Sequence, residues 1–311
     1  RTHRKMVSEL GLESDPVLEA SIVDAHSTLQ RAISLMAGDR GTLGPLKDEL
    51  LSVGELLSCN ILAANLRSRE RDAEWFDSRI VLITDSKAGN AQPDFELTER
   101  NIQQFLTPRI VQGKILVVQG FIGSDSTGRT TTLGRGGSDY TATILASNLK
   151  ADAVEIWTDV DGIMTADPSL VKNARRIPEM TFLEAAELAY FGAKVLHPAT
   201  IKPAIQSGIP VYVLNSRKPE VEGTVISPNG SQDPTTASEV KSVAYKEGLS
   251  VLTIKSTRML MAYGFMSKIF QVFDRYETSV VLVSTSEVSL SVTCLLYTSD
   301  AADELDGVDL G

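Results

Sequence analysis

The stretch that most constrains this chain is residues 130–139, Thr-Thr-Thr-Leu-Gly-Arg-Gly-Gly-Ser-Asp. An apolar run at residues 114–118 precedes it, and a helical pattern follows at residues 140–149. This order predicts a strand, a glycine-rich loop and a helix. A helix start presents unpaired N–H groups and the positive end of the helix dipole, and glycine lets the backbone approach a ligand closely. The sequence therefore predicts an anion-binding site here.

Polar side chains give this loop its chemistry. Arg135 carries a planar, permanently charged fork that suits a carboxylate or a phosphate. Ser138 and Asp139 are predicted to cap the following helix. The alternative is a loop that only turns the chain. The near absence of apolar residues exceeds what a turn requires, so the anion-binding interpretation is favoured.

Composition limits the classes of function. The chain has 311 residues, 42% of them hydrophobic and 23% charged, which is typical of one large or two ordinary globular domains. A net charge of −10 argues against nucleic acid and anionic membrane as partners. No apolar run approaches the ~20 residues of a membrane span, and no signal-peptide pattern opens the chain. Cys59 and Cys294 lack metal-type spacing, so neither a disulfide framework nor a zinc site is expected, and a cytoplasmic location fits best.

Helical and strand patterns alternate along most of the chain. Helices are expected at residues 16–36, 46–66, 98–105, 140–149, 182–190 and 198–206, and strands at 80–83, 114–118, 152–157 and 211–214. The alternation predicts an α/β fold with a mostly parallel sheet and helices on both faces. Ligands bind at the carboxyl ends of such strands, where residues 121–139, residues 158–167 and Asn215 fall.

The organisation changes after residue 227. Residues 228–238 are rich in Pro, Gly, Asn, Ser and Thr and are interpreted as a linker between a domain at 1–227 and a smaller one at 239–293. In the smaller domain, strand material is expected at 243–254, a helix at 263–276, and strands at 279–284 and 288–292. Residues 294–311 are interpreted as a non-native tail, because residues 294–304 resemble a translated sequencing-library end. The alternative is an ordinary acidic tail.

Several motifs occur together and in a fixed order. They are Phe-Ile-Gly at 121–123, the stretch 128–139, Trp-Thr-Asp-Val-Asp-Gly-Ile at 157–163, Phe-Gly-Ala-Lys-Val-Leu-His-Pro at 191–198, and Thr-Ser-Glu-Val at 285–288. Together they resemble the aspartate kinase branch of the amino-acid kinase family over most of the chain. The second module resembles part of a ferredoxin-like ACT domain. The resemblance implies an amino-acid-kinase-like α/β domain followed by this partial α+β domain.

The resemblance implies a phosphoryl transfer from ATP to L-aspartate. The product would be 4-phospho-L-aspartate, the first step toward lysine, threonine and methionine, with Mg²⁺ neutralising phosphate charge. The chain lacks a Walker-type loop and the protein-kinase motifs. The acceptor carboxylate is already a nucleophile, so no strong base is required, in keeping with a motif of cations, N–H donors and glycines. The alternatives are a kinase for glutamate, N-acetylglutamate or a nucleoside monophosphate, and a non-catalytic, effector-binding scaffold.

The resemblance also assigns substrate residues. Arg135 would bind a carboxylate of aspartate and Glu55 its α-ammonium; the alternatives are a surface salt bridge and a solvated helix-face glutamate. Phe121 would form a wall of the pocket or pack in the core. Arg135 and Asp139 are the expected catalytic residues. The expected substrate-binding residues are Glu55, Phe121, Arg135, Gly136, Gly137 and Ser138.

The nucleotide residues follow from the same comparison of motifs. Where the family often has Tyr and Arg, this chain has Met164 and Ser169, which removes an aromatic ring and a cation. His197 precedes Pro198 at a helix start and is interpreted as a cap or core residue rather than as an acid or base. The expected nucleotide-binding residues are Thr158, Asp159, Met164, Ser169, Lys194 and Val195.

The regulatory module and the start of the chain depart from the family pattern. Lysine-sensitive relatives carry Asp where Val281 stands, so lysine or threonine as effector is a hypothesis, with Met259, Gly264, Phe265, Thr285 and Ser286 as the expected effector residues. No match to the family's opening Lys-Phe-Gly-Gly-Thr-Ser segment occurs before Pro16, so this chain alone is expected to be a poor or inactive kinase. A homodimer that pairs through ACT domains is expected for the intact protein.

Overall fold

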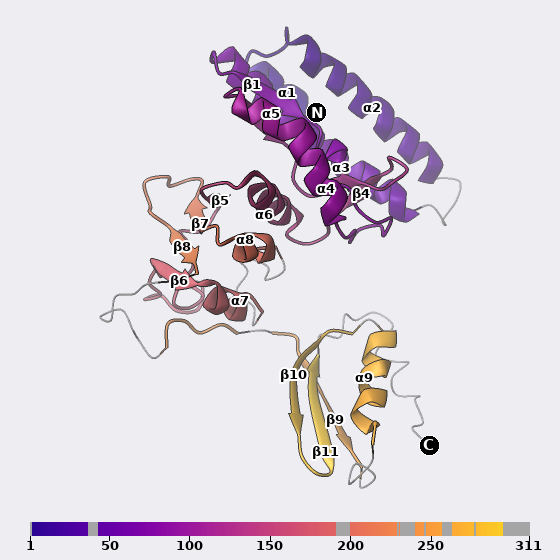
Figure 1. The fold of residues 1–311 in the computed structure, drawn as a ribbon, viewed down its shortest axis with the longest axis vertical. Coiled ribbons are helices and arrows are strands. Elements are labelled where there is room, and N and C mark those ends of the chain that lie inside the picture. The colour runs from indigo at the N-terminus through magenta and orange to yellow at the C-terminus, as the bar shows by residue number, and fades with distance from the viewer. Residues whose placement is uncertain are drawn as a thin grey trace. The chain divides into compact units, whose positions relative to one another are not determined.

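The computed structural model describes residues 2–36, 43–190, 200–228, 230, 240–245, 247–256, 263–276 and 278–294. The chain divides into two compact units, residues 1–244 and 245–311 (Figure 1). The first unit contains helices and mostly parallel strand pairs, and the second contains a small antiparallel sheet with one helix. The predicted α/β class with a partial ferredoxin-like domain is confirmed.

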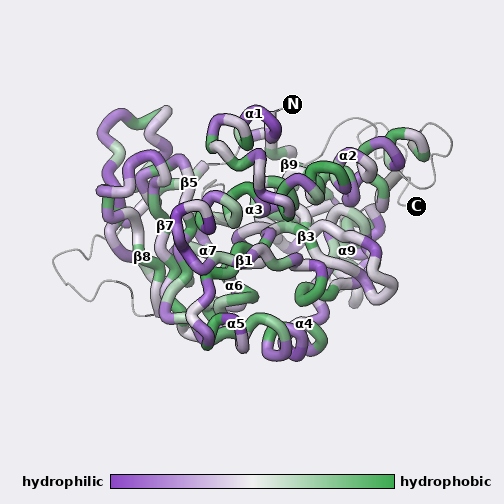
Figure 2. The backbone as a smooth tube through the Cα atoms, turned by 90° about the horizontal axis from the view of Figure 1, so that it is seen from above, coloured by the Kyte–Doolittle hydropathy of each residue, from purple (hydrophilic) through white to green (hydrophobic). Residues whose placement is uncertain are grey.

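Three helices open the first unit: α1 (Thr2–Glu9), α2 (Pro16–Met36) and α3 (Leu43–Ser68). The Oδ1 of Asp15 accepts hydrogen bonds from the first N–H groups of α2 at Val17 (3.0 Å) and Leu18 (2.9 Å), which fixes the start of the helix. Ala25 of α2 packs with Leu57 of α3 in a small core cluster. Figure 2 shows polar and apolar stretches alternating along α2, as expected for a helix with one buried stripe.

Two parallel strands, β1 (Ala73–Phe76) and β2 (Ile115–Val118), follow these helices. Between them lie the 3₁₀ turn η2 (Ser78–Ile80), helix α4 (Phe95–Asn101), the π-helical stretch η3 (Ile102–Leu106) and helix α5 (Thr107–Val111). The strand predicted at residues 80–83 is wrong. The N–H groups of Val81 and Leu82, whose side chains are buried, both bond to the carbonyl of Ser78, so this apolar run closes a turn. Only an isolated bridge from Ile83 to Ser124 is sheet-like there.

A hairpin separates β2 from the next helix. Strands β3 (Ile122–Ser124) and β4 (Thr130–Thr132) pair in antiparallel fashion, and helix α6 (Gly137–Leu149) follows. The prediction that residues 130–132 belong to a loop is therefore wrong, and the loop is confined to residues 133–136. All three threonines of β4 are buried.

The rest of the first unit is a four-stranded sheet in the order β5-β7-β8-β6. Its strands are β5 (Val154–Thr158), β6 (Glu179–Thr181), β7 (Val211–Asn215) and β8 (Thr224–Ser227), with helices α7 (Phe182–Tyr190) and α8 (Lys202–Ser207). Strands β5 and β7 run parallel, as do β6 and β8, whereas β7 and β8 are antiparallel. The carboxyl ends of β5 and β7 therefore lie side by side, at Thr158 and Asn215.

The second unit has strands β9 (Ser250–Lys255), β10 (Val280–Thr285) and β11 (Ser289–Cys294) in the order β10-β11-β9, with helix α9 (Phe265–Arg275) along one face of the sheet (Figure 1). Ile269 of α9 packs on Leu290 and Val292 of β11. The described part contains one strand before the helix, where the sequence led us to expect two. Cys294, the first residue of the predicted tail, is buried at the end of β11.

The chain between the units stays with the first unit longer than expected. The Nζ of Lys241 lies 2.9 Å from the carboxylate of Glu184, the Oγ of Ser242 donates to the carbonyl of Met164, and the N–H of Val243 donates to the carbonyl of Thr165. Residues 240–243 thus pack on the first unit rather than opening the second. Most of the predicted linker, residues 229 and 231–238, lies outside the described residues.

Helix α3 is the core helix of its part of the first unit. Its segment Gly44–Ser68 is long and apolar enough to cross a membrane by length and composition. It packs instead against α2, β1, β2 and β4, and it contains the buried, hydrogen-bonded carboxylate of Asp48. Those contacts identify α3 as a packed helix inside a folded domain.

Candidate functional site

The loop that leads into α6 has a backbone built by glycine. Gly134 and Gly136 have φ angles of 78° and 71°, a region that glycine adopts without strain. Gly136 is the N-cap of α6, and no side chain caps the helix. The prediction that Ser138 and Asp139 are caps is wrong, because both lie inside the first turn. The loop therefore leaves α6 with N–H groups that no cap side chain covers.

Phe121 lies against the start of α6. It has a positive φ of 71°, which is uncommon for a residue with a side chain, and its N–H donates to the Oγ1 of Thr141 at 3.1 Å. Its carbonyl accepts from the N–H of Leu133 at 2.9 Å. A β-carbon at Gly137 would lie 2.8 Å from the Phe121 ring, and one at Gly120 would lie 2.7 Å from the Cα of Ser138. The structure thus brings together Phe121, Gly137 and Ser138, three of the predicted substrate residues.

Two charged side chains flank this start of the helix. Arg135 is exposed, and within the described residues it has no hydrogen bond or ion pair. Asp139 is partly buried, and burial raises the pKa of its carboxyl group. A free guanidinium beside uncapped helix N–H groups forms a local positive site in a chain of net negative charge.

Glu55 lies in the middle of α3 and is half-buried. Burial, and secondarily the charge of Glu55, raise the pKa of the Cys59 thiol to about 11. Helix α3 packs on β4, the strand that leads into the Arg135 loop. In the described ranges no hydrogen bond or ion pair joins Glu55 to Arg135. The two residues are connected only through the packing of α3 on β4.

The ends of β5 and β7 carry a second polar group. The hydroxyl of Thr158 donates to the carboxylate of Asp159 at 3.3 Å, and the N–H and hydroxyl of Ser216 donate to the carbonyl of Thr158 at 2.8 and 2.9 Å. The Nζ of Lys218 lies 3.0 Å from the carboxylate of Asp161. The hydrogen bond from Lys218, followed by one from Asn215, lowers the pKa of Asp161. These bonds fix two strand ends side by side around Thr158 and Asp159.

The remaining predicted nucleotide residues lie in the loop between β5 and β6 or outside the described chain. Met164 forms an isolated bridge to Arg176. The N–H and hydroxyl of Ser169 both donate to the Oδ1 of Asp167, at 2.8 and 2.6 Å. Lys194 and Val195, and also His197, lie outside the described residues.

The predicted effector residues lie in the second unit. Gly264, with a φ of 76°, is the N-cap of α9, and Phe265 packs against the core that contains Ile269. Thr285 ends β10, and the hydroxyl of Ser286 lies 2.6 Å from that of Ser289. Val281, the position at which the resemblance implies Asp in lysine-sensitive relatives, is buried. Met259 lies outside the described residues.

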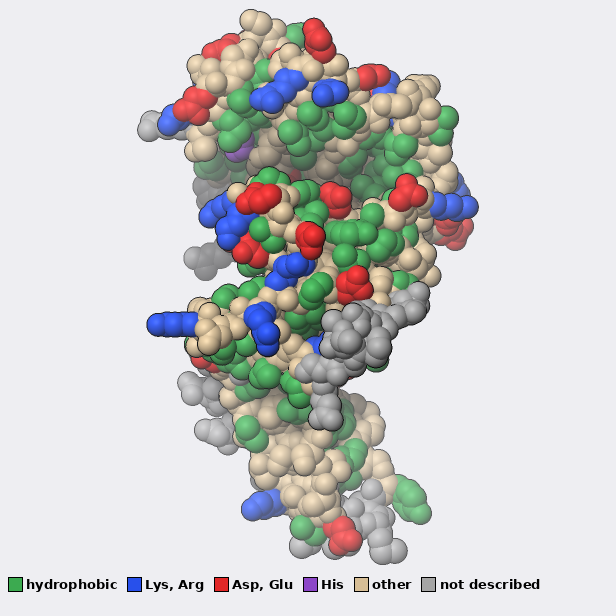
Figure 3. Space-filling view, turned by 90° about the vertical axis from the view of Figure 1, so that its left-hand side faces the viewer, with side chains coloured by type: hydrophobic (Ala, Val, Ile, Leu, Met, Phe, Trp, Pro, Cys, Tyr) green, Lys and Arg blue, Asp and Glu red, His purple; other side chains and the backbone are tan. Residues whose placement is uncertain are grey.

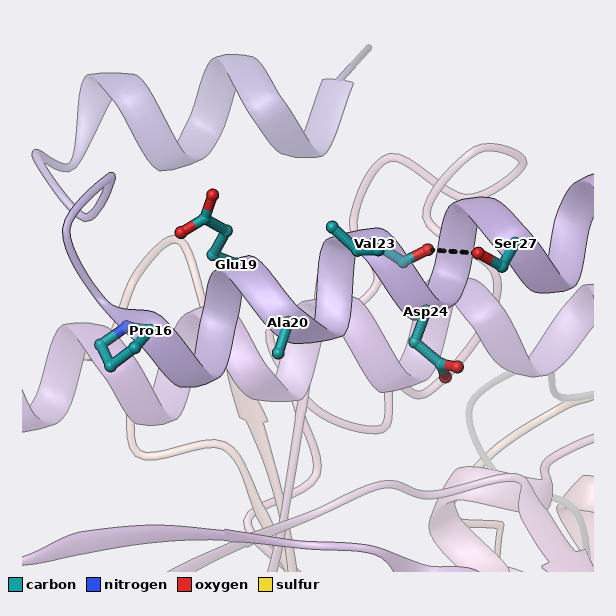
Figure 4. A pocket seen from close by; sticks show the side chains of 6 residues that line it. All are labelled: Pro16, Glu19, Ala20, Val23, Asp24 and Ser27. Carbon is teal, nitrogen blue, oxygen red and sulfur yellow. Dashed lines mark hydrogen bonds between the residues drawn. The ribbon is translucent and has the colours of Figure 1, made fainter.

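Two hollows lie on α2. One is lined by a single face of that helix, from Pro16 to Ser27 (Figure 4). The other lies between α2 and α3 and reaches Trp75 and Arg79. No predicted site residue lines either hollow. On the face drawn in Figure 3, acidic and basic side chains are interspersed with apolar ones.

No carboxylate-rich metal cage occurs in the described part of the chain. Within it, no group of three or more His, Cys, Asp or Glu side chains is placed to hold a metal ion. Mg²⁺ keeps several waters and often binds through substrate phosphates with one or two carboxylates.

One residue that sequence reasoning gave no role is Asp48 of α3. It is 1% exposed and bonds to Thr132, which lies 84 residues further along the chain. The only local signal was a carboxylate within a largely apolar helix pattern, and that signal does not name a partner.

Several known proteins are similar to this chain in sequence. The pattern of the "Amino acid kinase family" matches residues 2–215. Lysine-sensitive aspartokinase 3 of Escherichia coli is 47% identical over 248 residues, 80% of this chain and 54% of that protein. Aspartokinase 1, chloroplastic, of Arabidopsis thaliana is 38% identical over 94% of this chain and 50% of that protein. The chain thus spans about half the length of these two relatives.

Solved structures show the same relationship. The crystal structure of E. coli aspartokinase III in complex with aspartate and ADP superimposes with a TM-score of 0.78 and 43% identity, over 89% of this chain and 62% of that one. The aspartate kinase of Clostridium acetobutylicum gives a TM-score of 0.74 at 28% identity, over 96% and 62% of the two chains. The family pattern covers more than half of the sequence, and the structural match extends over most of it. The chain belongs to the amino acid kinase family.

Proposed function

We propose that the protein to which this chain belongs is an ATP-dependent aspartate kinase that converts L-aspartate to 4-phospho-L-aspartate. The observation that carries the proposal is the exposed guanidinium of Arg135, which has no partner among the described residues and which glycines place at the uncapped start of α6. A guanidinium and helix N–H groups bind a carboxylate well. The relative solved with aspartate and ADP supports the choice of substrate.

Phosphoryl transfer to a carboxylate requires the protein mainly to position the reactants and to supply positive charge. The side-chain carboxylate of aspartate is itself the nucleophile, so the residues need to bind and orient it while positive groups stabilise charge on the transferred phosphoryl group. Arg135 would hold a carboxylate of aspartate and Glu55 its ammonium, with Phe121, Gly136, Gly137 and Ser138 around them. Asp139 would lie beside the reacting groups.

The nucleotide would bind at the carboxyl ends of β5 and β7. Thr158 and Asp159 lie there, with Met164 and Ser169 in the following loop, and Lys194 and Val195 complete the proposed set. Mg²⁺ would arrive on the phosphate oxygens of the nucleotide and neutralise part of their charge. We expect this enzyme to be cytoplasmic and to form a homodimer through its second unit.

An ADP-release assay on the protein at its natural length tests the function. L-Aspartate should support turnover. N-Acetyl-L-glutamate and nucleoside monophosphates should support at least about a hundredfold less, because a site built for one set of polar groups rejects substrates that leave them unpaired. L-Glutamate should support about 10- to 200-fold less, because its additional methylene displaces the reacting carboxylate. Preference for another acceptor would assign the chain to a different branch of the family. Absence of turnover with all of them, alongside binding of an amino acid, would favour the effector-binding scaffold.

Lysine or threonine is the proposed effector of the second unit. A relative solved with lysine and aspartate supports this. Buried Val281 lacks the carboxylate that would pair with an ammonium, so inhibition by lysine should be weak. Titration of the natural-length enzyme with each amino acid tests this, and no inhibition by either would remove the regulatory proposal.

A further inference from the structure

Asp48 is a buried carboxylate that joins three segments of the first unit. Its side chain accepts hydrogen bonds from the hydroxyl of Thr132 at 2.8 Å and from the N–H of Thr132 at 3.3 Å. It also accepts from the N–H of Gly89, 3.0 Å from its Oδ2 and 3.1 Å from its Oδ1. Through one side chain, α3 is thereby tied to strand β4 and to the loop before α4.

These bonds are specific to one arrangement of the helix. Asp48 is 1% exposed, and no lysine or arginine pairs with it in the part of the chain that the structure describes. A carboxylate buried without partners is costly, so the donors at Gly89 and Thr132 must be in place for the helix to lie here. A shift of α3 by one residue would leave the charge and all these donors unpaired.

The same network reaches the loop that carries Arg135. The N–H of Ala91 donates to the carbonyl of Thr132 at 2.9 Å. A β-carbon at Gly134 would lie 3.0 Å from the carbonyl oxygen of Gly89, so the Gly89 loop packs closely against the residue before Arg135. Asp48 therefore fixes both segments that flank the start of the Arg135 loop.

Glu55 lies on the same side of α3 as Asp48. Seven residues separate them, which is close to two helical turns and about 10 Å along the axis. The helix is continuous from Leu43 to Ser68, so the position of Glu55 follows from the point at which Asp48 anchors it. One bond network thus determines how Glu55 lies relative to the Arg135 loop.

We propose that Asp48 is a positioning residue for the acidic amino-acid substrate. It holds the helix that carries Glu55 and the loop that carries Arg135 at the spacing at which one amino acid meets both. The inference rests on the proposed function. It concerns only the amino-acid half of the site, because the described residues of the proposed nucleotide set lie on β5 and in the loop that follows it.

Asp48→Asn is the direct test. Asparagine keeps one acceptor oxygen but turns an amide donor toward the N–H groups of Gly89 or Thr132. In the protein at its natural length, KM for L-aspartate should rise about 10- to 100-fold, the scale of a displacement near 1 Å in a site, while KM for ATP changes less than about twofold. Calorimetric titration should likewise show weaker binding of L-aspartate and little change in the binding of ADP.

Two further variants separate positioning from a general loss of stability. Thr132→Val removes the 2.8 Å bond to Asp48 while leaving the carboxylate, and it should raise KM for aspartate in the same selective way. Thr98→Val is the matched control, because Thr98 is equally buried and bonds to Ile83 instead. The control should lower Tm with no selective effect on aspartate. If Asp48→Asn does not fold, Thr132→Val carries the test.

The outcomes are distinct. A selective rise in KM for aspartate in Asp48→Asn and Thr132→Val, absent in Thr98→Val, supports the inference. Equal changes for both substrates, or none, would overturn it and leave the proposed function intact. If the unsubstituted protein binds no acidic amino acid, the proposed function fails, and the role of Asp48 fails with it.

Discussion

Phe121 and Gly137 are packed so closely that a single added carbon would not fit between them. A β-carbon at Gly137 would lie 2.8 Å from the Cδ2 of Phe121 and 3.1 Å from its Cα, and Phe121 already has a φ of 71°. The first turn of α6 is therefore pressed against a backbone segment with little freedom to move. Gly137→Ala should destabilise the fold by about 1–3 kcal/mol and raise KM for aspartate, because Phe121 must shift.

The control for Gly137→Ala is the same substitution where space exists. A β-carbon at Gly54, within α3, would meet no atom within 4 Å. Gly54→Ala should stabilise the protein by about 0.5–1 kcal/mol, because alanine is the better helix former. Urea unfolding of both variants measures whether Gly137→Ala loses stability while Gly54→Ala gains it. Equal effects would show that the contact between Phe121 and Gly137 is not what constrains this position.

Arg135 should matter for binding and not for folding. It is exposed and has no partner within the described residues, so Arg135→Ala should leave Tm within about one degree of the unsubstituted protein. A charge-assisted bond contributes about 1.5–3 kcal/mol, so kcat/KM for aspartate should fall about 10- to 100-fold. Arg135→Lys should recover only part of this, because lysine lacks the planar fork.

Arg129 lies in the turn between β3 and β4, and it should matter for folding and not for binding. Its guanidinium lies 2.9 Å from the buried carboxylate of Asp125. Arg129→Ala should therefore lower Tm while KM for aspartate stays unchanged. Steady-state kinetics and thermal unfolding of the two alanine variants test this division. A large fall in Tm for Arg135→Ala would mean that its guanidinium has a structural partner.

The predictions succeeded where the signal was local and periodic. Residues 16–36 and 182–190 form helices with the predicted bounds, because apolar residues recur at helical spacing over whole segments. The run at 80–83 carried the same apolar signal as a strand, but the Asp77 side chain accepts from Arg79 and starts a turn there. Residues 130–132 became a strand only because residues 122–124 pair with them.

Some features of the candidate site could also be predicted from the sequence, and others could not. The residue types of the Arg135 loop could be recognised in sequence because they are consecutive, whereas the capping role of Gly136 depends on a φ angle that residue type does not fix. Asp48 could not be found, because its partner Thr132 lies 84 residues away. Short strands such as β1 and β8 were missed because four residues rarely show a period.

Stability should depend on pH through Asp139. Burial raises the pKa of its carboxyl group in the folded state, so ionisation costs more in the folded than in the unfolded chain. The contribution of the protonated form is present below the unfolded pKa and is lost as pH rises through the folded pKa. Asp139→Asn should therefore be more stable than the unsubstituted protein at pH 7, and the difference should vanish below about pH 4.

Asp161 should make stability depend on pH in the direction opposite to that of Asp139. Hydrogen bonds from Lys218 and Asn215 lower its pKa, so its stabilising contribution is present above the unfolded pKa and is lost as pH falls through the folded one. Asp161→Asn should be less stable at pH 7, and the difference should shrink in acid. Thermal unfolding of both variants between pH 3 and pH 8 checks the two signs. Parallel curves for the two variants would contradict the assignment.

The nucleotide half of the site offers a gain-of-function test. The motif resemblance implies an aromatic ring and a cation at the positions of Met164 and Ser169. Ser169 is exposed and bonds only to the carboxylate of Asp167 among the residues described, so Ser169→Arg replaces little that stabilises the fold. A ring and a cation near a nucleotide each contribute about 0.5–1.5 kcal/mol. Met164→Tyr with Ser169→Arg should therefore lower KM for ATP about 5- to 150-fold, with KM for aspartate unchanged.

The control substitution places the same charge elsewhere on the unit. Asn173→Arg adds a cation four residues further along the loop, at an exposed position, and should leave both KM values as they are. Because the Met164 and Ser169 positions were assigned from motif order, a gain confined to ATP would support them together with Thr158 and Asp159. An unchanged KM for ATP in the double variant would remove Met164 and Ser169 from the proposed nucleotide site, while the Arg135 half would stand on its own tests.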